Sequence, residues 1–201
     1  MSFPSNLQSG SHWCAFFPTS QSTSDLSPIF RGNVERFLNA LNRAGAYVVI
    51  SATLRPRNRA LLMHMSWRVA NGLITPQEAT QRCANGVVVA NQSTVIPINW
   101  VHNDPEGEYS EAASLQAARE MKNNYRLVHQ PSLNSIHMEG NAIDMNISWS
   151  GTLTIVNATG QTVEIASFPR DGSNEMLHNV GRGYGVIKLA SDPPHWSENG
   201  R

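Results

Sequence analysis

Two segments in the last third of the chain contain residue types that bind metal ions. His137 and Asp144 stand on either side of Gly140, and His195 follows later, after two consecutive prolines that fix the backbone before it. Zinc in proteins is bound by histidine nitrogens and carboxylate oxygens, and a catalytic zinc has three protein ligands and an open position. These three residues are therefore candidate ligands. Spacing alone also fits a β-turn with a surface histidine and a capping aspartate.

Other acidic and histidine residues near these segments are candidates for a catalytic role. Asp192 precedes His195 in the order Asp-x-x-His, and a carboxylate there can take a proton from an attacking water. Glu139 and Glu198 lie close to candidate ligands in the sequence. We interpret both as surface residues, and they are secondary candidates for the general base. His178 is an alternative candidate for a metal ligand.

An arginine follows the first β-branched run of the chain. Residues 46–54 read AYVVISATL, which predicts a buried strand, and Arg55 comes directly after it. A guanidinium group at this position could bind a carboxylate or a developing oxyanion. Arg57 and Arg59 compete with Arg55 for this role.

The two segments resemble the zinc motifs of a known family. Residues 135–144, SIHMEGNAID, resemble the motif SxHxxGxAxD of the D-alanyl-D-alanine metallopeptidase family, which includes zinc carboxypeptidases and phage L-alanyl-D-glutamate endolysins. Asp192-x-x-His195-Trp196 resembles its second motif, and the strand that contains Ser51 and Thr53 and leads into Arg55 resembles a third element. The three elements occur in the family's order and span residues 46–196. The chain departs from the pattern at Ala60, where many relatives have a glutamine.

The resemblance implies a role for each matching residue. The ligands of a Zn²⁺ ion would be His137, Asp144 and His195. The general base would be Asp192, and Arg55 would act in catalysis while holding the substrate carbonyl or carboxylate. Ser135 and Gly140 would shape the ligand loop. Ser135 and Trp196 are further candidates for substrate contact, although we expect Trp196 to pack beside the site rather than to stack on a sugar.

The resemblance also implies a substrate class. A zinc peptidase of this family would cleave peptidoglycan stem peptides at a bond involving a D-amino acid, and the aspartate at position 192 favours the L-Ala–D-Glu endopeptidase branch. Two alternatives stay open. One is a D,D-carboxypeptidase or endopeptidase, and the other is a non-hydrolytic, zinc-bearing module that binds the cell wall.

Composition and charge limit the partners and the location. The chain has 201 residues, of which 40% are hydrophobic and 15% charged, and its formal net charge is zero. This predicts a packed core and excludes the basic field of a nucleic-acid binder. No stretch predicts membrane insertion or a standard secretion signal. We therefore expect synthesis in the cytoplasm and action in the periplasm or cell wall after delivery. A holin would deliver a phage endolysin, and a secretion apparatus would deliver an antibacterial effector that has an immunity protein.

Sequence patterns predict an α+β domain with a small antiparallel sheet that carries the zinc site, flanked by helices as in hedgehog/DD-peptidase-like folds. We expect an irregular lead-in over residues 1–24 and a single domain over 25–201. Helices are predicted from Pro28, Pro56 and Thr75-Pro76, after Ser110 and after Ser173, and strands over 46–54, 141–149, a hairpin near 151–165, and 185–190. Residues 87–109 read as a long ordered loop. Cys14 and Cys83 form no CxxC pair, and they are either two thiols or, outside the cytoplasm, one disulfide.

Overall fold

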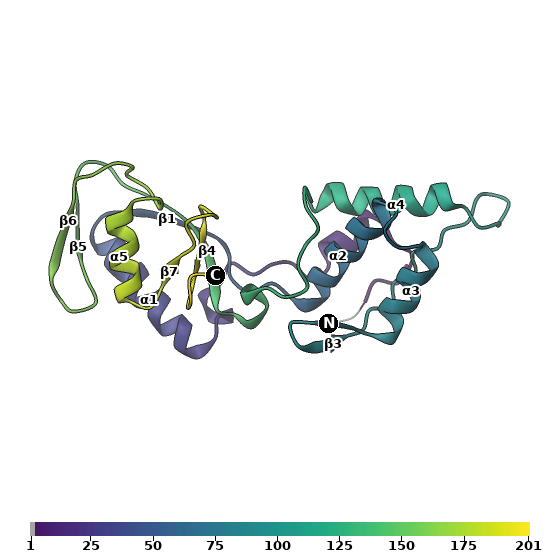
Figure 1. Cartoon of the computed structure of the whole chain (residues 1–201), viewed down its shortest axis with the longest axis horizontal. Coiled ribbons are helices and arrows are strands. Elements are labelled where there is room, and N and C mark those ends of the chain that lie inside the picture. The colour runs from purple at the N-terminus through teal and green to yellow at the C-terminus, as the bar shows by residue number, and fades with distance from the viewer. Residues whose placement is uncertain (1–2) are drawn as a thin grey trace. The chain divides into compact units, whose positions relative to one another are not determined.

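A computed structural model, which describes residues 3–201, shows an α+β protein whose chain divides into two compact units (Figure 1). The first unit contains the residues up to Pro18 together with Pro56–Ser135, and the second contains Thr19–Arg55 together with Ile136–Arg201. This division does not follow the expected boundary at residue 24, because Trp13 and Phe17 are buried core residues of the first unit. The extent of a zinc-peptidase domain over residues 25–201 stays a prediction.

Helices dominate the first unit. Helix α2 (Arg57–Ala70) packs against α4 (Glu111–Asn124), and α3 (Pro76–Asn85) and the short helix η1 (Ser11–Ala15) lie against this pair. The predicted starts of α3 and α4 are confirmed, and α2 begins at Arg57, one residue after the predicted start at Pro56. The Thr75 side chain accepts a hydrogen bond from the Glu78 N–H, and Ser110 accepts one from Ala113, so each cap satisfies a backbone donor that the helix cannot.

A short hairpin corrects the prediction of a loop over residues 87–109. Strands β2 (Val87–Val89) and β3 (Gln92–Thr94) pair through a two-residue turn. Both turn residues, Ala90 and Asn91, have positive φ angles of 45° and 60°. Such turns usually contain glycine, so an Ala-Asn turn carries a weak sequence signal.

The second unit is built on a four-stranded antiparallel sheet in the order β1-β4-β8-β7. The strands are β1 (Tyr47–Ala52), β4 (Ala142–Ser148), β8 (His195–Ser197) and β7 (Ile187–Lys188), and the helices are α1 (Pro28–Arg43) and α5 (Glu175–Gly183). One core joins the helices to the sheet and includes Phe30, Val34, Phe37, Ile143, Met145, Leu177 and Trp196. The predicted α+β class with a small antiparallel sheet is confirmed.

Several local predictions for the second unit need correction. Strand β1 is an edge strand, with Tyr47 69% and Val49 41% exposed, so the prediction of a buried strand is wrong. The cap of α5 is Asn174 rather than Ser173, because the Asn174 side chain accepts from the N–H groups of Met176 and Leu177. Strand β7 has only two residues rather than the six predicted over 185–190.

Two further elements of the second unit follow the sequence closely. Helix α1 starts at Pro28, directly after its N-cap residue Ser27, as predicted. The hairpin of β5 (Leu153–Val156) and β6 (Thr162–Ile165) is also confirmed, and its turn is closed by bonds from Gly160 and Gln161 to Asn157.

The two cysteines do not form a disulfide. Cys14 and Cys83 are free, and burial raises the pKa of Cys83 to about 11, which keeps that thiol protonated.

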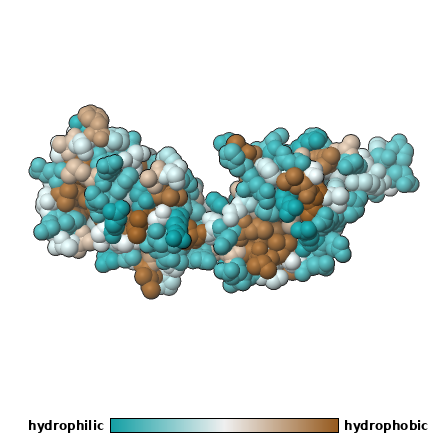
Figure 2. All heavy atoms as spheres, in the orientation of Figure 1, coloured by the Kyte–Doolittle hydropathy of each residue, from teal (hydrophilic) through white to brown (hydrophobic). Residues whose placement is uncertain are grey.

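Hydrophilic side chains cover much of the face in Figure 2, with apolar patches between them. Within residues 3–201, we find no helix that combines the length and the apolar character required to span a membrane.

Candidate metal centre

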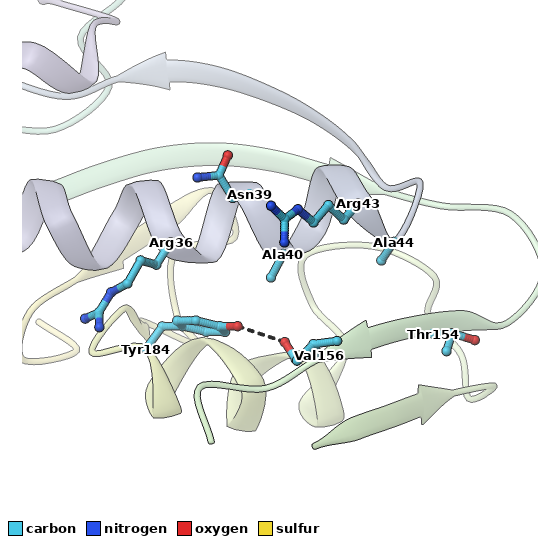
Figure 3. A pocket seen from close by; sticks show the side chains of 8 residues that line it. All are labelled: Arg36, Asn39, Ala40, Arg43, Ala44, Thr154, Val156 and Tyr184. Carbon is cyan, nitrogen blue, oxygen red and sulfur yellow. Dashed lines mark hydrogen bonds between the residues drawn. The ribbon is translucent and has the colours of Figure 1, made fainter. Parts of the chain in front are cut away.

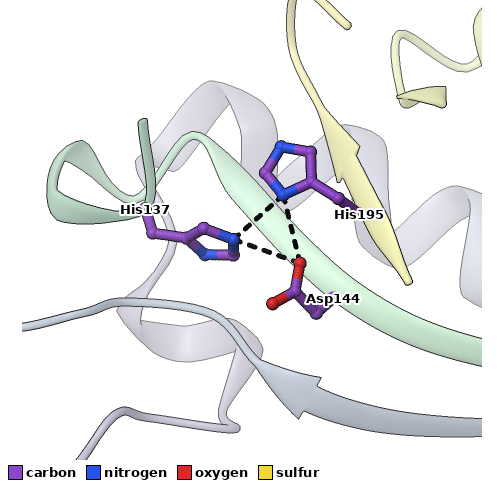
Figure 4. A group of neighbouring side chains, drawn as sticks. All are labelled: His137, Asp144 and His195. Carbon is purple, nitrogen blue, oxygen red and sulfur yellow. Dashed lines mark hydrogen bonds and ion pairs between the residues drawn. The ribbon is translucent and has the colours of Figure 1, made fainter. Parts of the chain in front are cut away.

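Three side chains meet in the second unit with their ligand atoms facing one another (Figure 4). The Nε2 atom of His137, the Oδ1 atom of Asp144 and the Nδ1 atom of His195 form a triangle whose three sides are each 3.1 Å. Both histidines are buried, with exposed fractions of 3% and 6%. The structure therefore brings together the three residues that the sequence analysis selected as ligands.

Strand pairing places two of the three residues. Asp144 of β4 lies directly opposite His195 of β8 in the antiparallel ladder, so both side chains point to the same face of the sheet. The next pair, Ile143 and Trp196, points to the opposite face, where both are fully buried. His195 follows the last predicted strand, residues 185–190, and the structure places it on a further strand, β8.

The third residue, His137, comes from the short helix η3 (Ile136–Glu139) that leads into β4. This turn needs a glycine at its end. Gly140 has a φ of 72°, and a Cβ atom there would lie 2.9 Å from the Ser27 nitrogen and 3.0 Å from the Asp25 oxygen. The Gly140 carbonyl also accepts a hydrogen bond from Ser27. Gly140 therefore shapes the ligand loop by allowing it to pack closely against the start of α1.

Backbone carbonyls set the proton positions of both histidines. His137 Nδ1 lies 2.7 Å from the Thr53 carbonyl, and His195 Nε2 lies 2.9 Å from the Arg201 carbonyl. A carbonyl only accepts hydrogen bonds, so these two nitrogens carry the protons. In the neutral rings the remaining nitrogens then direct lone pairs at each other and at the Asp144 carboxylate. Three converging acceptors repel one another unless a cation lies between them, so the group could hold a metal ion.

Burial, hydrogen bonds and neighbouring charges shift the pKa values of Asp144 and His195. Burial raises the pKa of Asp144, but hydrogen bonds and charge from His137 and His195, when a proton lies on the nitrogens that face the carboxylate, outweigh this and hold its pKa well below the usual range. For His195, burial lowers the pKa, but the hydrogen bonds to Asp144 and the Arg201 carbonyl, with the charges of Asp144 and Asp192, raise it overall. The group therefore favours a bound positive charge, whether a proton or a metal ion.

Arg55 belongs to the same compact unit as the three ligands. Its backbone N–H donates to the carbonyl of His137 at 3.0 Å, so the chain carries Arg55 next to the ligand loop. Its competitors start helix α2 in the first unit. There the Arg59 guanidinium lies over the Tyr125 ring at 4.9 Å and donates to the Cys14 carbonyl. The backbone bond favours Arg55 over Arg57 and Arg59.

The acidic candidates near the ligands are all exposed. Asp192 lies in the loop before β8, and its charge contributes to the raised pKa of His195, so the two groups are near each other. Glu139 ends η3, and Glu198 accepts a hydrogen bond from the Asn141 amide at 3.1 Å. Ser135, two residues before His137, is partly exposed.

Trp196 and His178 are packing residues. Trp196 has no exposed surface, and its ring lies 5.6 Å from each of the rings of Phe37 and His178. The structure therefore assigns Trp196 to the core, as expected for a residue that packs beside the site. Its selection as a candidate for substrate contact is not supported, because its side chain is fully buried. His178 Nε2 donates to the Gly172 carbonyl, and His178 is not part of the ligand group.

Sequence reasoning missed three residues around the site. The carbonyls of Thr53 and Arg201 orient the ligand histidines, and the ammonium group of Lys188 binds the loop that precedes His195. Backbone carbonyls carry no signal in the residue type. Lys188 could have been noticed as one of only two lysines in the chain, beside Lys122.

The second unit also contains a cavity of about 440 Å³ (Figure 3). One face of α1, strand β5 and Tyr184 line it, and the Tyr184 hydroxyl donates to the Val156 carbonyl at 2.9 Å. Arg36 and Arg43 lie along α1 at its border. None of the three clustered ligands lines this cavity, so it is a separate feature of the unit.

Comparisons of the chain with protein-family models, curated proteins and solved structures give no match, so any proposal of function depends on the site itself.

Proposed function

We propose that the protein is a zinc-dependent peptidoglycan peptidase that cleaves stem peptides at a bond involving a D-amino acid, with the L-Ala–D-Glu bond favoured. The observation that carries this proposal is the triangle of His137, Asp144 and His195 with both histidine lone pairs directed inward. These residues occupy the ligand positions of the motifs that resemble the D-alanyl-D-alanine metallopeptidase family. The proposal includes the hedgehog/DD-peptidase-like fold for the sheet that carries them.

The donor set fits zinc better than calcium or magnesium. Two nitrogens and one carboxylate oxygen match the ligands that zinc prefers, whereas calcium takes six to eight oxygens. Bonds of about 2.0 Å in a tetrahedral site separate neighbouring ligand atoms by about 3.3 Å. The three separations of 3.1 Å are close to that value. Three protein ligands leave one position open, as in catalytic rather than structural zinc sites.

The chain's own residues supply the remaining parts of a peptidase. When bound, zinc makes water a stronger acid and polarises the scissile carbonyl. Asp192, exposed in the loop before His195, would take the proton of the attacking water and pass it to the leaving amine. Arg55, next to the ligand loop, would bind the developing oxyanion or a substrate carboxylate. Ser135 would contribute to the rim of the substrate site.

Delivery follows from the substrate, because peptidoglycan lies outside the cytoplasm. Two routes match this function: release through a holin as a phage endolysin, or export by a secretion apparatus as an antibacterial effector. The effector route requires an immunity protein in the producing cell. Neither route requires this chain to insert into a membrane or to bind nucleic acid.

Digestion of purified sacculi tests the proposal. Protein purified without added metal should contain about one zinc per chain, and it should release new amino groups that mass spectrometry of the muropeptides assigns to one bond. Release of terminal D-Ala alone would indicate a D,D-carboxypeptidase. Zinc content and sacculus binding without cleavage would indicate the binding module. Full activity in metal-free protein would refute the proposal.

A further inference from the structure

Lys188 binds three carbonyl groups of the loop that carries His195 to the metal centre. Its Nζ atom donates to the carbonyls of Asp192 at 2.5 Å and His195 at 3.1 Å, and also to the carbonyl of Leu189. An ammonium group has three N–H donors and no acceptor. The three carbonyls therefore match its full donor capacity, and all three belong to residues 189–195.

The same three carbonyls already close the loop on itself. Leu189 accepts from the Asp192 N–H at 3.2 Å, Asp192 accepts from the His195 N–H at 3.0 Å, and His195 accepts from the Leu189 N–H at 3.1 Å. Each carbonyl oxygen has a second lone pair, and Lys188 uses it. The ammonium group thus ties together a turn whose carbonyl oxygens would otherwise repel one another.

The other contacts of Lys188 and of the loop hold this arrangement in place. Lys188 lies opposite Trp196 in the β7–β8 ladder, and its Nζ atom is 5.8 Å from the centre of the Trp196 ring. At the far end of the loop, the Pro194 carbonyl accepts from the Met145 N–H of β4 at 2.7 Å. The loop is therefore attached to β4 on one side and to Lys188 of β7 on the other.

We propose that Lys188 is a positioning residue of the metal centre, which sets the loop 189–195 so that His195 Nδ1 and the Asp192 carboxylate reach their working positions. Preorganised ligands bind more tightly because less conformational entropy is lost on binding. This inference rests on the metal-binding part of the proposed function and not on peptide hydrolysis.

Zinc affinity and the visible spectrum of the cobalt(II) form test the proposal. We expect Lys188→Met to bind zinc about 10 to 100 times more weakly in competition with a chelator, the usual effect of losing an outer partner of a ligand. The d–d bands of cobalt(II) should shift, because they report the ligand geometry. Lys122→Met, the matched control, removes the other lysine, which bonds to Asn71 in the first unit, and should change neither quantity.

Chemical rescue separates positioning from general stability. In Lys188→Ala, methylammonium supplies the missing N–H donors and should restore part of the zinc affinity. Tetramethylammonium at the same ionic strength has no N–H donor and should restore nothing. Rescue by both salts, or by neither, would contradict the proposal.

A measurement on the wild-type chain covers the case in which the variants do not fold. Acylation of its two lysines should modify Lys122 faster than Lys188, whose donors are all engaged; equal rates would overturn the proposal. The proposal is also overturned if Lys188→Met keeps the wild-type zinc affinity and cobalt spectrum. A wild-type protein that binds no zinc would instead refute the proposed function. The acylation rates would still show whether the N–H donors of Lys188 are engaged.

Discussion

Buried or half-buried histidines occur in both compact units, but they have different partners. In the first unit, His64 Nδ1 donates to the Pro131 carbonyl at 2.8 Å, and the Gln130 amide reaches its Nε2 at 3.4 Å. His102 bonds to the Ser9 hydroxyl at 2.9 Å. The hydrogen-bond partners named for both rings are uncharged groups. Burial lowers the pKa of each, which favours the neutral form.

In the second unit, His137 and His195 also bond to backbone carbonyls through one nitrogen, but their other nitrogens meet at a carboxylate. The pKa of His195 is raised rather than lowered. Burial of a histidine is therefore no sign of a metal site. What distinguishes the second unit is a set of acceptors that no group of the protein satisfies without a proton or a metal ion.

The largest expected effect comes from removing a ligand. His137→Ala deletes one of three protein ligands, so the variant should lose its zinc and all measurable hydrolysis. His64→Ala, the matched change in the first unit, should cost about 1–3 kcal/mol of stability by leaving the Pro131 carbonyl unpaired, with zinc content unchanged. Elemental analysis and sacculus digestion measure both variants. Loss of zinc from the His64 variant would break the distinction between the two histidine environments.

Asp192 separates catalysis from metal binding within the second unit. Asp192→Asn keeps the shape of the side chain but removes the base, so hydrolysis should fall by a factor of about 10² to 10⁴ while zinc content stays the same. Glu198→Gln, which removes an exposed carboxylate on the other side of His195, is the control and should keep near-normal activity. If Asp192→Asn loses zinc, Asp192 is a ligand and Glu139 becomes the next candidate for the base.

Arg55 and Arg57 belong to different units, and their variants test which of the two acts in catalysis. Arg55→Lys should lose about 2–4 kcal/mol of transition-state stabilisation, because an ammonium group cannot reproduce the paired hydrogen bonds of a guanidinium. Arg57→Ala, two residues later and in the first unit, should keep its kcat/KM. Steady-state kinetics on a stem peptide measure both. An inactive Arg57→Ala with a normal Arg55→Lys would assign the role to Arg57.

The smallest effect is a pH dependence of stability. The raised pKa of His195 in the folded metal-free protein stabilises it below the ordinary histidine pKa of about 6.5. This contribution is lost as pH rises through the folded-state pKa. His64 and His102 act in the opposite direction because their pKa values are lowered. The difference in unfolding free energy between the wild type and His195→Gln, both without metal, should therefore be larger at pH 6 than at pH 8.

Zinc should reverse this trend. Protons compete with the metal for His195, so the stability that zinc adds should increase with pH. Thermal melts across the same pH range, with and without zinc, should show stability changing with pH in opposite directions. A wild-type and His195→Gln difference that is independent of pH without metal would show that His195 has no proton-binding role.

Much of the fold and of the ligand set was predictable from local patterns. Ser-Pro and Thr-Pro pairs place the starts of α1 and α3 because proline is preorganised for the first helical turn. The α+β class followed from the order of helices and strands. His137, Asp144 and His195 could be selected because ligand chemistry depends on residue type and because residues 135–144 and 192–196 resemble the two zinc motifs of the D-alanyl-D-alanine metallopeptidase family.

The sequence by itself determined which residues are able to bind a metal, and only the tertiary structure decided how they meet. The 3.1 Å triangle depends on the register of β4 with β8, which joins residues far apart in the chain. The same register turns Trp196 into the core although it is adjacent to His195. The hydrogen bonds to the carbonyls of Thr53 and Arg201, and those from Lys188 to the carbonyls of its loop, cannot be predicted from the sequence, because every residue type has a carbonyl and only folding brings one to a given side chain.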